Sequence, residues 1–222
     1  MKKITKLLAL VLALALVFSL TACAKQATIT GSWKYVMDMS KVLESAGMMD
    51  EADGSGMYTA EQLQAIKDAY GKIFEGLNLT MILDLKEDGT YTMDMDEASQ
   101  KAAADTLSAR LPEVLPELFA AMLGISVDEL PAALETLGMS MDDLTNSEEY
   151  SAEEMLGDFS SETEKGTYTF EEGKLVLTPE DGDVVTMTVE LSATELKVTA
   201  FESKDEEEAE VYKAMLPMVF VR

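Results

Sequence analysis

Residues 166–201 read GTYTFEEGKLVLTPEDGDVVTMTVELSATELKVTAF, and this stretch decides the fold. Apolar and polar residues alternate along it in four short segments. The turn-forming pair Glu172-Gly173 separates the first segment from the second, and Asp181-Gly182 separates the second from the third. Strict alternation places every second side chain on one face, which is the mark of a half-buried strand. Because short turns join antiparallel neighbours, the stretch predicts four antiparallel strands paired in sequence order.

Four further segments show the same alternation, at residues 29–39, 79–85, 90–95 and 217–222. Eight such strands can close on themselves, and closure removes the exposed edges that an open sheet would leave. We therefore predict a mainly β fold, an eight-stranded antiparallel up-and-down barrel. The residues that should face the interior, and line any ligand held there, are Tyr35, Met37, Met81, Leu83, Met93, Met95, Tyr168, Phe170, Met187 and Met218.

We predict helical insertions in two connections, between the first and second strands and between the third and fourth strands. Thr59 followed by Gln62 reads as a capping box for a helix that begins there. The longer insertion, residues 97–165, should hold several short helices, because proline is tolerated only in a first helical turn. The prolines concerned are Pro112, Pro116 and Pro131.

The N-terminus has the layout of a secretory signal peptide over residues 1–22: three lysines, an uncharged core too short to span a bilayer, then small residues. Leu20-Thr21-Ala22-Cys23 resembles the lipobox of bacterial lipoproteins. The resemblance implies that Cys23 is acylated and that the protein is anchored by lipid on the extracytoplasmic face of the cell membrane. Residues 23–27 would form the tether and residues 28–222 the barrel domain. The alternative is an ordinary secreted protein with a chance cysteine.

The predicted barrel opens on Gly31-Ser32-Trp33 and ends at Arg222. In this it resembles the lipocalin-like, or calycin, class. The resemblance implies that Trp33 plugs the closed end, that Arg222 packs over it as a cation–π pair, and that a small apolar ligand binds inside. An unrelated sandwich or half-open sheet, with Trp33 as an ordinary core residue, is the alternative.

The charge balance restricts the partners. The chain has 42 acidic residues against 17 lysines and arginines. Nucleic acid and anionic lipid are therefore poor partners. In an up-and-down barrel the long connections, at about 40–77, 97–165 and 202–215, should share one end and make it acidic. Since Cys23 lies close to the start of the first strand, that end should face away from the membrane.

The residue types present argue against catalysis. The chain has no histidine, and its single cysteine is assigned to the lipid. This removes catalytic triads, imidazole bases and the commonest zinc ligands, so we predict no enzyme activity and no cofactor. Carboxylate pairs remain formally possible. The Met-x-Met pairs could hold Cu(I) but are better explained as strand residues that point inward.

The stretch DEADGSGMYTAE, residues 50–61, resembles the loop of a calcium-binding EF-hand. Glu51, Asp53 and Ser55 would be its weak candidate ligands. Gln62 stands where an EF-hand needs a bidentate glutamate, so we expect no tight metal site.

Two hypotheses of function remain open. The first is that a small apolar or amphipathic ligand binds in the barrel or at its mouth, beneath a helical lid. The second is that the barrel interior is solid and the acidic helical insertion binds an envelope protein.

Overall fold

A computed structural model describes residues 27–45, 57–147, 150–157, 163–180, 183–204 and 206–222 of the chain. Its centre is a closed barrel of eight strands, each hydrogen-bonded to its sequence neighbours, with the last strand returning to the first. The prediction of an eight-stranded antiparallel up-and-down barrel of lipocalin-like type is confirmed, and the closed pairing excludes a half-open sheet. The strands are β1 Gly31–Asp38, β2 Asn78–Leu85, β3 Thr90–Met95, β4 Glu164–Glu171, β5 Lys174–Pro179, β6 Val185–Leu191, β7 Glu195–Glu202 and β8 Met218–Val221.

The register of the strands places the apolar positions on the inside. In β2 every second residue from Leu79 to Leu85 is buried, as the alternation predicts. Trp33 of β1 lies opposite Leu83 of β2. The barrel closes where Lys34 of β1 pairs with Val221 of β8.

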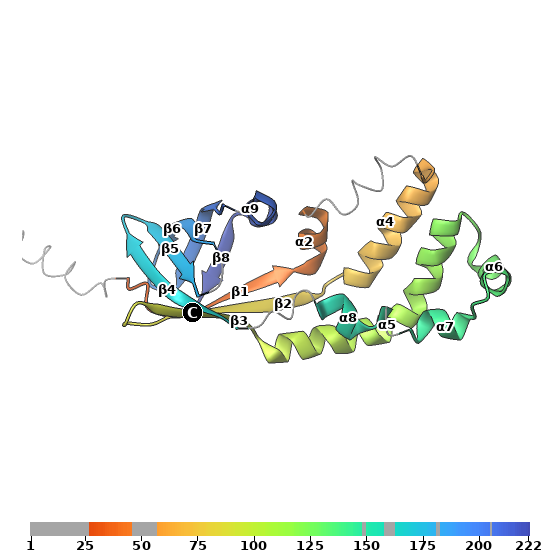
Figure 1. The fold of residues 1–222 in the computed structure, drawn as a ribbon, viewed down its shortest axis with the longest axis horizontal. Helices are drawn as coiled ribbons and strands as arrows, with labels where there is room; N and C mark the ends of the chain where they lie inside the picture. Colours follow the sequence, from red (N-terminus) through yellow and green to blue (C-terminus); the bar gives the residue numbers. More distant parts are fainter. Residues whose placement is uncertain (1–26, 46–56, 148–149, 158–162, 181–182, 205) are drawn as a thin grey trace, which may run out of the picture.

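The connections alternate between the two ends of the barrel. At one end lie the tight turns β2–β3, β4–β5 and β6–β7, of which Glu172-Gly173 has both central residues at positive φ, 51° and 78°. Two positive φ values match the right-handed twist of the flanking strands. The helical connections lie at the other end, as predicted (Figure 1). The helices are α2 Met39–Ser45, α4 Ala60–Phe74, α5 Glu97–Leu123, η1 Val127–Glu129, α6 Leu130–Thr136, α7 Met141–Thr145, α8 Ala152–Gly157 and α9 Glu206–Ala214.

Helix α5 corrects one prediction. It runs for 27 residues with Pro112 and Pro116 inside it, so this part of the insertion is not divided into short helices. A proline inside a helix removes one backbone hydrogen bond and pushes on the preceding turn, which bends a helix without ending it when packing holds both halves. Here Leu111 and Leu115, which directly precede the two prolines, are buried. Figure 1 shows the axis of α5 changing direction along its course.

Helices α4 and α5 pack against each other and carry the fold away from the barrel; we call α4 together with residues 97–157 the helical arm (Figure 1). Arg110 of α5 donates hydrogen bonds to the backbone carbonyls of Ile73 (2.7 Å) and Glu75 (3.0 Å) at the C-terminal end of α4. These bonds satisfy carbonyls that a helix end leaves without partners. None of the helices in the described ranges has the length and apolar character needed to span a membrane.

Two hydrophobic clusters hold the protein together. The larger one runs from the barrel interior through α4 and α5. The smaller one lies at the far end of the arm, where Leu130, Leu134 and Leu144 are buried against Phe119 and Tyr150. The end of the arm therefore has a core of its own.

Candidate functional site

The closed end of the barrel is sealed by Trp33 and Arg222. Trp33 is completely buried, and its Nε1 donates a 2.7 Å hydrogen bond to the carbonyl of Ile29. The guanidinium carbon of Arg222 lies 4.0 Å from the centroid of the indole ring. Its Nη2 also donates to the carbonyls of Thr28 and Thr30, the latter at 3.0 Å. This is the packing that the lipocalin resemblance implies, and its role is structural.

The barrel interior contains a cavity of about 30 Å³. A cavity of this size holds about one water molecule, whereas pockets for small ligands measure about 300–1,000 Å³. Of the ten residues predicted to line a ligand site, five line this cavity: Met81, Leu83, Met93, Met187 and Met218. The other residues that line it, which were not among those ten, are Glu164, Leu177, Val185, Phe201, Tyr212 and Phe220.

The other five predicted lining residues lie elsewhere in the interior cluster. Tyr35 packs on Phe220 with ring centroids 5.2 Å apart, and Met37 is buried. The Tyr168 hydroxyl donates to the carbonyl of Lys86, in the tight turn between β2 and β3. The two remaining residues, Met95 and Phe170, are partly buried against the cluster.

Aromatic side chains occupy part of the barrel interior. Tyr91 is buried and its hydroxyl donates to the carboxylate of Glu164. Burial, and then this contact, raise the pKa of Tyr91 above its ordinary value. Near the helical end, Phe201 of β7 stacks on Tyr212 of α9, with centroids 4.4 Å apart. Helix α9 was not predicted from the sequence, and it covers this part of the interior.

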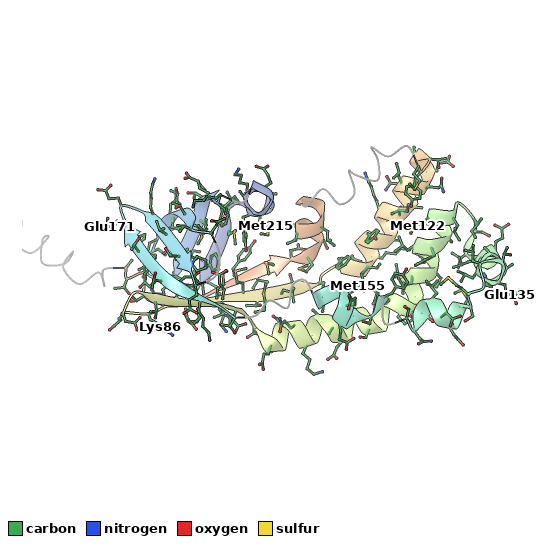
Figure 2. All side chains as sticks on the ribbon, viewed as in Figure 1. Lys86, Met122, Glu135, Met155, Glu171 and Met215 are labelled. Atoms are coloured by element: carbon green, nitrogen blue, oxygen red, sulfur yellow. The ribbon has the colours of Figure 1, made fainter. Side chains whose placement is uncertain are left out.

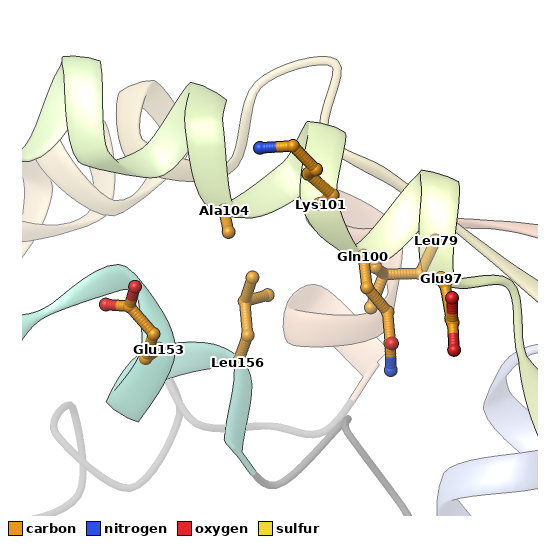
Figure 3. Close-up of a pocket in the computed structure, with 7 residues that line it drawn as sticks. All are labelled: Leu79, Glu97, Gln100, Lys101, Ala104, Glu153 and Leu156. Carbon is orange, nitrogen blue, oxygen red and sulfur yellow. The ribbon is translucent and has the colours of Figure 1, made fainter.

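A larger depression, of about 350 Å³, lies outside the barrel between α5 and α8 (Figure 3). Its apolar surface comes from Leu79 of β2, Ala104 of α5 and Leu156 of α8. Figure 3 shows Ala104 and Leu156 facing each other across it. Polar side chains surround them: Glu97, Gln100, Lys101 and Glu153. The capping pair Ser151 and Glu154 indicates α8 in the sequence but not the helix against which it packs.

The end of the arm exposes apolar side chains. We call residues 122–146, from the last turn of α5 to the end of α7, the arm tip. Ten large hydrophobic residues of the described chain are exposed, and five of them lie within this short segment. They are Met122 (39% exposed), Leu123 (43%), Val127 (44%), Leu137 (64%) and Met139 (38%).

The arm tip is also uniformly acidic. The sequence has no lysine or arginine between Arg110 and Lys165. Backbone and side-chain hydrogen bonds from Ser126 lower the pKa of Glu129, and those from Ser140 lower the pKa of Asp143. Both carboxylates therefore stay ionised well below neutral pH. The acids of the tip are Asp128, Glu129, Glu135, Asp142 and Asp143.

Hydrogen bonds fix the shape of the arm tip. Ser126 with Glu129 and Ser140 with Asp143 form two capping boxes. The sequence carries the signal for both, because each serine lies three residues before an acidic residue. Gly124 ends α5 in the left-handed conformation at φ 68°.

The structure describes the EF-hand-like stretch from residue 57 onward, and this part forms the N-terminal cap of α4. Thr59 and Gln62 form the predicted capping box of α4. The Gln62 side chain also donates to the carbonyl of Met122 at 3.3 Å, which joins the start of α4 to the end of α5. The candidate calcium ligands Glu51, Asp53 and Ser55, and the lipidation site Cys23, lie outside the described residues. Within the described part of the chain, no group of three or more carboxylates is placed to hold a metal ion.

No protein-family model, curated protein or solved structure matches this chain. The class of protein is therefore the one that the topology defines, a closed lipocalin-like barrel, here carrying a helical arm.

Proposed function

We propose that the chain is a lipid-anchored extracytoplasmic protein that binds another protein through its helical arm, with the barrel as a solid support. The observation that carries this proposal is that the cavity which the described residues line inside the barrel measures only about 30 Å³. Of the two hypotheses left open by the sequence, it favours the interaction protein over a ligand stored in the barrel. The proposal contains no catalytic step and no cofactor.

The geometry of the two ends supports this division of roles. Thr28 lies at the closed end, where its carbonyl accepts a hydrogen bond from Arg222. Cys23 precedes it by only a few residues. A lipid on Cys23 would hold the closed end at the membrane, and the arm would then point outward. Rigid scaffolds usually carry their binding surfaces at such elaborated ends.

A truncation of the arm tests the proposal in cells. Residues 126–145 would be replaced by a short glycine–serine linker. The matched control carries the same linker inserted in the turn at residues 192–194, at the closed end. Fluorescence of Trp33, the single tryptophan, checks that the barrel remains folded in both. After formaldehyde cross-linking, we expect a protein partner with the wild type and the control that is absent with the truncated chain. The same partners in all three would overturn the proposal.

The depression between α5 and α8 supports a second candidate function, the binding of a small amphipathic molecule at the barrel mouth. Its volume of about 350 Å³ falls in the range of ligand pockets. Filling it with Leu156→Trp should abolish saturable binding of a fluorescent fatty acid, while Val36→Trp, on an exposed barrel position, should not. Absence of saturable binding to the wild type would exclude this second candidate.

A further inference from the structure

We infer that the arm tip binds a cationic amphipathic segment of a partner protein, one that presents lysine or arginine beside an apolar stripe. This inference rests on the proposed function and specifies the partner. It combines two observations at one place, exposed apolar side chains and a surface without positive charge.

The apolar side chains mark the tip as a contact surface. Leu137 is 64% exposed although leucines beside it in the chain, such as Leu134, are buried in the cluster of the tip. The tip thus has enough apolar residues to fill its own core and leaves others in solvent. Such concentrations of exposed apolar surface, rimmed by polar residues, mark interaction sites in soluble proteins.

The charge decides which partner fits. An acidic surface repels nucleic acid and anionic lipid. It also repels a second copy of the same tip, because the tip has five carboxylates and no lysine or arginine. A protein segment with basic residues is complementary to it, and complementary charge raises the rate and specificity of association. Figure 2 shows both Glu135 and Met122 on the half of the arm that lies away from the barrel.

The tip is preorganised for such a partner. Its turns are fixed by the capping boxes of Ser126 and Ser140, and Gln62 holds the start of α4 to the end of α5. Binding then requires little ordering of the tip, and less ordering leaves more of the contact energy as affinity. A helical segment of the partner could lie with its apolar stripe on the exposed side chains and its basic residues toward the carboxylates, a recurring mode of recognition.

The test uses a fluorescently labelled synthetic helical peptide of leucine and lysine, with binding to the full chain measured by anisotropy at several salt concentrations. Replacing Leu137 or Val127 by aspartate makes the tip more acidic and less apolar. If the peptide contacts the apolar surface, each change should weaken binding by about tenfold. If attraction is purely electrostatic, each change should strengthen it. Val36→Asp, on the exposed outer face of β1, is the matched control and should not weaken binding.

The charge contribution is tested in the same assay. Glu135→Gln should weaken binding and reduce its dependence on salt, whereas Glu171→Gln, at the closed end of the barrel, should do neither. Unchanged or tighter binding by the Leu137 and Val127 variants overturns the inference. The proposed function is tested separately, by whether the truncated chain retains the cross-linked partners of the wild type.

Discussion

Replacing Arg222 with alanine should destabilise the barrel by about 2 kcal/mol. The cation–π contact with Trp33 contributes about 0.5–1 kcal/mol, and each hydrogen bond to the carbonyls of Thr28 and Thr30 about 0.5–1.5 kcal/mol. Because Arg222 is exposed to solvent, we take the lower part of the summed range. For a chain of this size, the change corresponds to about 4–8 °C in melting temperature.

Urea unfolding followed by Trp33 fluorescence measures this loss of stability. Trp33 is the single tryptophan and lies under the guanidinium, so its fluorescence reports on the site of the change. Arg222→Lys should fall between wild type and alanine, because lysine keeps the charge but not the planar group that donates to two carbonyls. Lys174→Ala, an exposed change on β5, is the control and should stay within about 0.5 kcal/mol. A wild-type unfolding midpoint for Arg222→Ala would refute the reasoning.

Three further predictions concern ionisation and the lipid anchor. The pKa of Tyr91 is raised, so its contribution to stability is complete below the ordinary value of 10.0 and is lost as pH rises above that value. In alkaline urea titrations the wild type should therefore lose more stability than Tyr91→Phe. The pKa values of Glu129 and Asp143 are lowered, so their capping contributions are complete above the ordinary pKa values, 4.5 for Glu129 and 3.8 for Asp143. These contributions are lost as pH falls through the lowered values. Hydrogen exchange in η1 and α7, corrected for the intrinsic exchange rate, should then accelerate. Cys23→Ala should release the protein from membranes, and continued sedimentation with them would contradict lipid anchoring.

The strands could be predicted because alternation is a local signal. Each half-buried strand, such as β2, repeats it over several residues, and glycine marks the tight turns β2–β3 and β4–β5. The cavity volume could not be predicted, since alternation identifies which side chains point inward but not how completely they fill the interior. Tyr91 and Phe201 occupy space that the sequence left open for a ligand.

The arm was harder to predict than the barrel. A proline considered alone indicates the end of a helix. Helix α5 nevertheless continues past Pro112 and Pro116, because Leu111 and Leu115 are packed in the core. Helix α9 escaped prediction in an acidic stretch whose composition suits a loop equally well. The exposed residues of the arm tip also gave no signal, because Leu134 and Leu137 differ in exposure only through the way the short helices fold together.

The most direct test of the account places a photo-cross-linking amino acid at Leu137 in the arm tip or at Val36 on the barrel wall, in cells that express the full chain. Both positions are exposed, so both report what lies beside them. We predict a discrete protein adduct from position 137 and none from position 36. No adduct from position 137, or the same adduct from both positions, would contradict the claim that the barrel supports a binding surface at the end of the arm.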